Sequence, residues 1–258
     1  VNTTEVLKKR YLKKDDHQRI IETPSELFRR VASAVAKADD SYKSEVSRDQ
    51  AEEKFYRMMR NQEFMPNSPT LMNAGTSFGQ LSACFVLPVE DSMEGIFESL
   101  KNMARIHQTG GGTGFGFSNL RPKGALVSST KGQASGPVSF MKIFDQATDV
   151  IVQGGRRRGA NMGILRCDHP DILDFIEAKT ASNQFENFNL SVAVTDKFMK
   201  AVRQDKAFAL SHPADSSGAR KIRAKAVFDL IVNAAWRSGD PGLVFIDEVN
   251  RRNPTPEI

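Results

Sequence analysis

The chain has 258 residues, of which 26% are charged and 40% are hydrophobic, and its formal net charge is +5 at pH 7. This length accommodates one large domain or two smaller ones. The excess of positive charge is too small for a dedicated nucleic-acid-binding protein, although it suits anionic ligands such as nucleotides. The sequence has no run of about 18 apolar residues and starts Val1-Asn2-Thr3-Thr4 without an apolar signal core. It therefore predicts a cytoplasmic protein that neither spans a membrane nor is secreted.

The first 62 residues are predicted to be helical. A helix should begin at Thr23-Pro24-Ser25-Glu26, which combines an N-cap threonine, a proline at the first helical position and a glutamate three residues after the cap. A second helix is predicted over residues 51–61, because Phe55, Met58 and Met59 recur at helical spacing.

Strands and helices alternate after Pro66. We expect a buried strand over residues 83–87, followed by a helix capped by Ser92, with one buried face formed by Met93, Ile96, Phe97, Leu100 and Met103. Further helices are predicted over residues 139–152, from 168–170 onward, over 195–202 and over 224–236. Further strands are predicted over 161–165 and 188–194, and an exposed loop over 211–220. This alternation predicts an α/β sheet or barrel behind the helical N-terminal region.

Two glycine-rich segments stand out. Residues 110–116 contain five glycines in seven positions, so the backbone there either approaches a ligand or a neighbouring segment closely or adopts positive φ angles. The spacing matches neither a P-loop nor a dinucleotide fingerprint, and ligand approach and tight packing both remain open. Residues 153–159 carry three adjacent arginines, which suit phosphates or bases but also a solvated turn.

Single thiols and a helix start are the other candidates for chemistry. Cys84 and Cys167 are too few for a disulfide framework or a paired-cysteine metal site, and a small buried core residue is the usual explanation for each. No protein-ligated metal is expected, because no zinc spacing is found among the four histidines, His17, His107, His169 and His212. Asp91, Ser92 and Glu94 are most simply a capping cluster worth about 1 kcal/mol, although free N–H groups at a helix start also hold ligands.

Six motifs follow one another along the chain, at residues 65–75, 81–92, 109–122, 134–141, 153–159 and 168–172. In this order they closely resemble the large catalytic subunit of ribonucleotide reductases, over nearly the whole chain. The chain resembles the class II, adenosylcobalamin-dependent branch in two respects: the sequence GGGTGFGFSNLRP at residues 110–122, and the lack of an N-terminal ATP-binding helical cone.

The resemblance implies a fold and a reaction. The helical region of residues 1–62 would precede the first part, residues 63–258, of a ten-stranded α/β barrel made of two antiparallel five-stranded halves around a finger loop. A cysteine on that loop becomes a thiyl radical that takes the ribose 3′-hydrogen; the 2′-hydroxyl then leaves as water, and a cysteine pair supplies two electrons while forming a disulfide. Cys84 resembles the first-strand member of that pair, which replaces the buried-core interpretation.

The resemblance also implies site residues. Substrate, a ribonucleoside di- or triphosphate, would be held by Ser68, Ala83, Cys84, Gly111 and Gly112, with the glycines leaving room for its phosphates. A deoxynucleoside triphosphate effector would be bound by Asp91, Ser92, Met93, Arg121 and Lys123. Gln153 and either Arg157 or Arg158 would lie in the loop that links effector to substrate base.

The radical-cysteine loop and the second redox cysteine would follow residue 258. We therefore expect this chain to be inactive alone and to need the C-terminal remainder of the reductase, as either an N-terminal half or a truncated polypeptide. The other expected partners are a second copy of the chain and a thioredoxin-like reductant, with no membrane and no direct nucleic acid. Two alternatives stay open: a class I large subunit, which needs a separate radical-generating protein, and a non-catalytic effector-binding module whose helices after Ser92 and Ser139 pair with a second copy.

Overall fold

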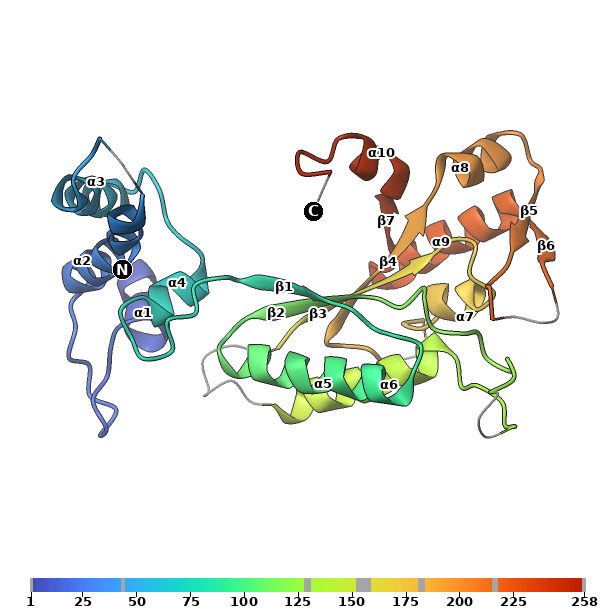
Figure 1. The fold of residues 1–258 in the computed structure, drawn as a ribbon, viewed down its shortest axis with the longest axis horizontal. Coiled ribbons are helices and arrows are strands. Elements are labelled where there is room, and N and C mark those ends of the chain that lie inside the picture. Colours follow the sequence, from blue (N-terminus) through green and yellow to red (C-terminus); the bar gives the residue numbers. More distant parts are fainter. Residues whose placement is uncertain are drawn as a thin grey trace. The chain divides into compact units, whose positions relative to one another are not determined.

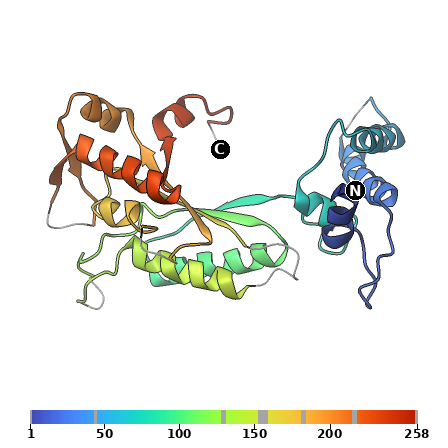
Figure 2. The same ribbon diagram turned by 180° about the vertical axis from the view of Figure 1, so that it is seen from behind.

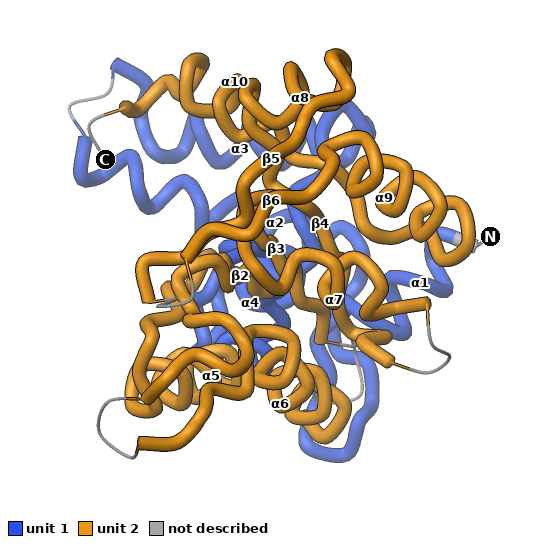
Figure 3. Tube along the Cα trace, turned by 90° about the vertical axis from the view of Figure 1, so that its right-hand side faces the viewer, with its two compact units in different colours: residues 1–85, 106–112, 152–158 blue, residues 86–105, 113–151, 159–258 orange. Residues whose placement is uncertain are grey.

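The computed structural model describes residues 2–42, 45–127, 131–151, 159–180, 184–214 and 218–256. The chain divides into two compact units, coloured separately in Figure 3. The first comprises residues 1–85, 106–112 and 152–158, and the second comprises residues 86–105, 113–151 and 159–258. Each unit has an apolar core of its own.

The described part of the first unit is mainly helical, with an isolated antiparallel bridge between Lys14 and Ile20. Its helices are α1 (Asn2–Arg10), α2 (Pro24–Ala36), the 3-10 helix η1 (Lys37–Ser41), α3 (Arg48–Arg60) and α4 (Ser68–Asn73). The predicted start of α2 is confirmed, since Thr23 and Glu26 form a capping box. A second box, Ser47 with Gln50, starts α3 three residues before the predicted position. The short helix α4, capped by Asn67, was not predicted, because its motif reads locally as turns.

A nearly buried ion pair ties the helices of the first unit together. Arg30 on α2 contacts Glu22 at 2.7 Å, and their side chains are only 10% and 6% exposed. The same guanidinium donates to the carbonyl oxygens of Ala74, at 2.6 Å, and Leu71, at 3.3 Å. Arg30 therefore satisfies carbonyl groups at the end of α4, which stabilises the packing of that short helix on the unit's apolar core.

The second unit is built on a five-stranded sheet with the order β1-β2-β3-β4-β7 (Figures 1 and 2). The strands are β1 (Cys84–Leu87), β2 (Gly112–Gly116), β3 (Asn161–Arg166), β4 (Phe188–Val194) and β7 (Gly242–Phe245). The pairs β2–β3, β3–β4 and β4–β7 are parallel. This arrangement confirms the predicted α/β class, and the predicted strands at residues 161–165 and 188–194 are present.

Helices cover this sheet. They are α5 (Met93–Gln108), α6 (Pro137–Val150), α7 (Ile172–Ile176), α8 (Asp196–Arg203), α9 (Ala224–Ser238) and α10 (Ile246–Arg251). Helices α5 and α6 lie side by side in Figures 1 and 3, and Thr148 on α6 reaches the Met103 sulfur on α5 at 3.7 Å. A separate antiparallel hairpin joins β5 (Ala207–Leu210) to β6 (Arg220–Arg223). The exposed loop expected at 211–220 lies between these strands, with residues 215–217 outside the described part and Arg220 already in β6.

Two sequence expectations about burial are wrong. Strand β1 is not buried: Cys84 is exposed and Val86 is 87% exposed, because β1 stands at one end of the strand order. On α5, Met93 and Phe97 are exposed, and the buried stripe instead runs through Ile96, Ser99, Met103 and His107. Ile96 and Met103 are buried and Leu100 packs against the core, as predicted, so only Met93 and Phe97 depart from the expected face.

An aromatic cluster fills the core beneath the sheet. Phe115, Phe117 and Phe144 are almost fully buried, with ring centroids 4.9 to 5.7 Å apart. Phe188 on β4 joins them at 6.2 Å from Phe117. Phe115 lies in the glycine-rich strand β2, and Phe117 directly follows it. The position of β2 therefore depends on this packing.

In the part of the chain that the structure describes, no helix is both long and apolar enough to cross a membrane.

Candidate functional site

A pocket in the second unit gathers most of the residues expected to bind an effector. Its volume is about 450 Å³. It is lined by Asp91, Ser92, Met93, Glu94, Ile96, Leu120, Arg121, Val127, Gln133, Ala134, Ser135 and Phe140. Four of the five expected effector residues are therefore brought together, although Asp91 and Arg121 are 30 positions apart in the chain. The fifth, Lys123, is exposed and lies outside the lining.

Asp91 and Arg121 form a paired contact at this pocket. The Asp91 carboxylate accepts a hydrogen bond from Arg121 Nε at 2.8 Å and another from its backbone N–H at 3.1 Å. Both side chains remain slightly more than a quarter exposed. Asp91 therefore orients Arg121 and is not itself the cap of α5; Ser92 takes that role, since its Oγ accepts from the N–H of Gly95 at 3.0 Å.

The pocket has a charged end, lined by Asp91, Glu94 and Arg121, and an apolar end. Backbone N–H groups at the start of α5 and the Arg121 guanidinium favour anionic groups. Ile96, Leu120 and Phe140 add apolar surface against which a sugar or a base can pack. The geometry thus suits a ligand with an anionic end and a flat or apolar end.

Three of the residues expected to hold substrate meet in the first unit. The N–H of Gly112 donates to the carbonyl oxygen of Ala83 at 2.8 Å, which places the glycine segment beside the residue that precedes Cys84. Cys84 is an exposed free thiol. Ser68 begins α4, and its hydroxyl lies 2.9 Å from the Tyr11 hydroxyl. Helix α4 also contacts the segment that leads into β1, because Thr70 Oγ1 donates to the carbonyl oxygen of Leu81 at 2.9 Å.

Gly111 owes its identity to tight packing. A Cβ atom at this position would lie 2.7 Å from the Ile106 side chain and 3.0 Å from the Phe85 ring, closer than side chains tolerate. Within the 110–116 segment, only Gly110 adopts a positive φ, of 89°. The tight-packing alternative therefore holds at Gly111, while room for substrate phosphates stays a prediction.

A polar clamp near the glycine segment was missed by sequence reasoning. The buried side chain of Asn73 donates to the carbonyl oxygens of Gln80, at 3.0 Å, and Thr109, at 3.1 Å. Gln80 Nε2 in turn donates to Thr109 Oγ1 at 3.2 Å. These contacts hold residues 73–80 against the start of the glycine segment. Asn73 lies inside the motif at residues 65–75, but nothing in the local sequence indicates partners 36 positions away.

Cys167 is structural, as the sequence predicted. Its side chain is fully buried in the core of the second unit, and burial raises the pKa of its thiol to about 11. The thiol is therefore protonated and inaccessible at neutral pH.

The two thiols are expected to react differently with iodoacetamide. The native chain should take up one equivalent, at exposed Cys84, and the urea-unfolded chain two equivalents, as measured by mass spectrometry. The Cys84→Ala variant should remain unlabelled in the native state. Native labelling of that variant at the rate of the wild type would contradict the assignment.

His169 is held neutral beside the pocket. Its Nδ1 accepts from the N–H of Asp171 at 3.0 Å, so the proton resides on Nε2, which donates to the carbonyl oxygen of Leu120 at 2.9 Å. Burial lowers the pKa of this imidazole and outweighs the hydrogen bond to the Leu120 carbonyl, which is the largest opposing effect; Asp171 and Asp168 also raise the pKa, and His212 lowers it.

The low pKa of His169 predicts acid sensitivity. As the pH falls through about 6.5, the unfolded chain takes up the proton first, so the free energy of unfolding decreases by at most about 1.4 kcal/mol per pH unit until the folded pKa is reached. Urea denaturation at pH 7.5 and 5.5 should show a larger decrease for the wild type than for His169→Gln. Equal decreases in both proteins would refute this assignment.

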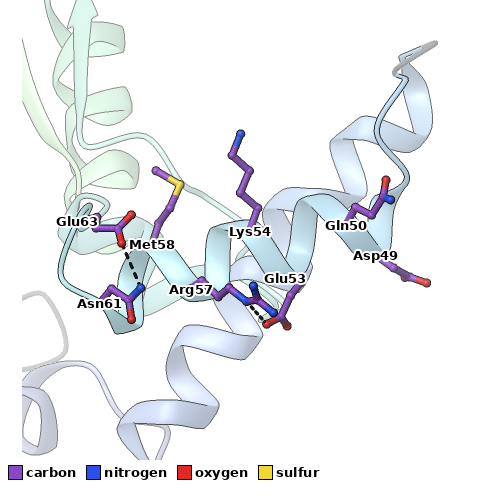
Figure 4. A pocket seen from close by; sticks show the side chains of 8 residues that line it. All are labelled: Asp49, Gln50, Glu53, Lys54, Arg57, Met58, Asn61 and Glu63. Carbon is purple, nitrogen blue, oxygen red and sulfur yellow. Dashed lines mark hydrogen bonds and ion pairs between the residues drawn. The ribbon is translucent and has the colours of Figure 1, made fainter.

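A surface hollow on α3 contains no expected site residue (Figure 4). Its lining comes from residues 49–63. Two pairs of lining side chains contact each other: Arg57 donates to Glu53 at 2.8 Å, and the Asn61 amide donates to Glu63 at 3.1 Å. Arg29 and Arg57 lower the pKa of Glu53, which is fully ionised at neutral pH. We interpret this hollow as a solvent-exposed surface of α3 and not as a binding site.

Other expected residues receive no structural description. Gln153, Arg157 and Arg158 lie outside the described residues. Among the residues that are described, no group of three or more histidine, cysteine, aspartate or glutamate side chains is arranged to hold a metal ion.

Comparison with known proteins agrees with this arrangement. The all-alpha domain of ribonucleotide reductase matches residues 1–79, and the barrel domain of ribonucleotide reductase matches residues 82–258. A vitamin B12-dependent ribonucleoside-diphosphate reductase of Thermoplasma acidophilum is 46% identical over all of this chain and 41% of its own length. A protein of the same name from Mycobacterium tuberculosis is 50% identical over 97% of this chain and 36% of its own length.

A more distant relative is the ribonucleoside-diphosphate reductase large subunit of Vaccinia virus, 30% identical over 96% of this chain and 34% of its own length. The chain thus spans well under half the length of each of these relatives. The two matched domains follow one another along the chain and together cover nearly all of its residues. The chain therefore belongs to the ribonucleotide reductase large-subunit family.

Proposed function

We propose that this chain is the N-terminal part of an adenosylcobalamin-dependent ribonucleotide reductase, which converts ribonucleoside diphosphates to 2′-deoxyribonucleoside diphosphates. Two relatives at 46% and 50% identity carry the names of vitamin B12-dependent reductases of ribonucleoside diphosphates, which supports both the cofactor and the diphosphate substrate. The class I alternative is less well supported, since the Vaccinia virus large subunit is only 30% identical.

The observation that carries the proposal is the pocket formed by Asp91, Ser92, Met93 and Arg121. These residues are distant in sequence yet line one cavity with an anion-binding end and an apolar end. We assign this cavity to a deoxynucleoside triphosphate effector, with the phosphates near Arg121 and the start of α5. Lys123 would act from outside the lining, as a charge near the phosphates.

The substrate site would be built on the neighbouring backbones of Ala83 and Gly112, with Ser68 contributing a hydroxyl. The N–H groups of Gly111 and Gly112 already donate to the carbonyl oxygens of Ile106 and Ala83, so these glycines would contribute space for the diphosphate and not hydrogen-bond donors. The exposed thiol of Cys84 would protonate the departing 2′-hydroxyl and supply electrons with a second cysteine from the remainder of the reductase. Gln153 and Arg157 or Arg158 would contact the substrate base.

The redox chemistry implies a reductant and a compartment. A thioredoxin-like dithiol would re-reduce the disulfide that involves Cys84. We place the enzyme in the cytoplasm, because Cys84 and Cys167 are both free thiols and reducing conditions preserve them.

Adenosylcobalamin would supply radical initiation by homolysis of its carbon–cobalt bond. The choice of this cofactor rests on the names of the relatives, and no described residue is assigned to the corrin.

A second copy of the chain would pair through α5 and α6. Helix α6 presents an apolar strip that includes Ile143 and Val150, the latter 80% exposed, and α5 exposes Phe97. Exposed apolar faces of this kind favour helix pairing between subunits. This surface also fits the non-catalytic module alternative, which predicts dimerisation without turnover.

Calorimetry tests the proposed effector site. The wild-type chain is expected to bind dTTP with saturable heat, and Arg121→Ala to bind at least about tenfold more weakly, because a charge-assisted contact to phosphate is lost. Arg105→Ala, which removes an exposed arginine on α5, is the matched control and should bind like the wild type. Absence of saturable heat in the wild type would refute the effector assignment.

Reconstitution tests the class. Supplying the C-terminal remainder with adenosylcobalamin, a dithiol and a ribonucleoside diphosphate should give deoxynucleotide without any further protein. A requirement for a separate radical-generating protein would favour the class I alternative.

A further inference from the structure

We propose that His169 and Asp171 are positioning residues that hold one wall of the effector pocket and thereby set its affinity for nucleotide. The inference rests on the effector function proposed above for that pocket. Neither residue lines the pocket: His169 contacts the lining residue Leu120, and Asp171 contacts Lys123, two positions after the lining residue Arg121.

Two hydrogen bonds from the turn at residues 168–171 anchor the wall that carries Arg121. His169 Nε2 donates to the carbonyl oxygen of Leu120 at 2.9 Å, and the Asp171 carboxylate accepts from the N–H of Lys123 at 2.8 Å. Arg121 lies between these two anchor points. Because its guanidinium lies on the pocket side, its placement depends on the backbone that His169 and Asp171 hold.

The carboxylate of Asp171 also lies close to Gly136, which directly follows a second segment of the pocket lining. A Cβ atom at Gly136 would lie 2.6 Å from Asp171 Oδ2 and 2.9 Å from the backbone nitrogen of Lys123, and Gly136 adopts a φ of +79°. Gly136 follows Ala134 and Ser135, which line the pocket. Three chain segments therefore converge on one carboxylate oxygen with no space for a methyl group.

Asp171 does not cap its own helix, α7. It occupies the N-cap position of α7, where an aspartate side chain ordinarily accepts from the first turn of its own helix. Its side chain makes no such capping hydrogen bond. The carboxylate instead reaches 48 positions back along the chain to Lys123, so its interaction serves the pocket wall.

Calorimetry with dTTP on this chain tests the proposal. Asp171→Ala is expected to weaken binding about tenfold, because the N–H of Lys123 loses its acceptor and the wall is released. Asp171→Asn keeps an acceptor oxygen and should restore the affinity to within about threefold of the wild type. Asp174→Ala, which removes an exposed carboxylate three residues away, is the control and should bind like the wild type.

The outcomes separate the two proposals. If Asp171 has a purely structural role, Asp171→Ala should lower the midpoint of unfolding but leave the dTTP affinity of the folded protein unchanged, and Asp171→Asn should then make no difference to that affinity. Wild-type affinity in Asp171→Ala would overturn the positioning role alone, whereas no binding by the wild-type chain would remove the effector site and this inference with it. If Asp171→Ala does not fold, Gly136→Ala replaces it, and unchanged affinity there would equally overturn the proposal.

Discussion

Replacing Cys84 with serine in the complete reductase is expected to lower dithiol-supported turnover by roughly 10³-fold or more. A hydroxyl group can donate a proton, but it cannot form the disulfide that supplies two electrons to the substrate. The measurement is the amount of deoxynucleotide formed per enzyme over many turnovers, with the C-terminal remainder, adenosylcobalamin and excess dithiol present.

Cys167→Ala is the matched control for this experiment. Its thiol is buried in the second unit and makes no contact with the proposed substrate residues that we have described, so turnover should stay within about twofold of the wild type. Sustained turnover by Cys84→Ser, or its loss in a folded Cys167→Ala variant, would show that the redox role belongs to another residue.

Truncation of Phe144 to alanine is expected to destabilise the second unit by about 3–5 kcal/mol. The ring is fully buried, with centroids 4.9 Å from Phe115 and 5.7 Å from Phe117, so its removal leaves a cavity beneath β2. Urea denaturation followed by circular dichroism measures the change.

Trp236→Ala provides the comparison, because this ring on α9 is 87% exposed and its loss should cost less than about 1 kcal/mol. A cost for Phe144→Ala no larger than that for Trp236→Ala would mean that the aromatic cluster contributes little to the stability of the sheet.

Local signals in the sequence predicted much of the fold. The Thr23–Glu26 capping box, the cap at Thr195 and the apolar run in β4 each act over a few residues, and the corresponding elements are present. The hairpin of β5 and β6 and strand β7 were not predicted, because four-residue strands carry little pattern and are defined by their pairing partners. The face of α5 was predicted only in part: Ile96, Leu100 and Met103 pack in or against the core, but Met93 and Phe97 are exposed, since neighbouring elements decide how wide a stripe of a helix is buried.

The candidate site depended on long-range information. From its apolar neighbours alone, Cys84 is predicted to be a core residue, and only the resemblance to reductases identified it as a candidate for redox chemistry; the structure shows it exposed. The Asp91–Arg121 pair and the Asn73 clamp join positions 30 and 36 apart, which no local pattern encodes. The sequence identified Asp171 only as a member of the motif at residues 168–172. Its contact with Lys123 could not be predicted, because the two residues are brought together only by the fold.

The exposed strand β1 affects how this chain behaves in solution. Strand β1 is at one end of the described sheet, and the N–H and C=O groups along such an edge can pair with a strand of another molecule. The exposed isopropyl group of Val86 adds an apolar contact to such pairing. Concentrated preparations of the 258-residue polypeptide should consequently form intermolecular sheet and precipitate, and a charged lysine in place of Val86 should keep them clear.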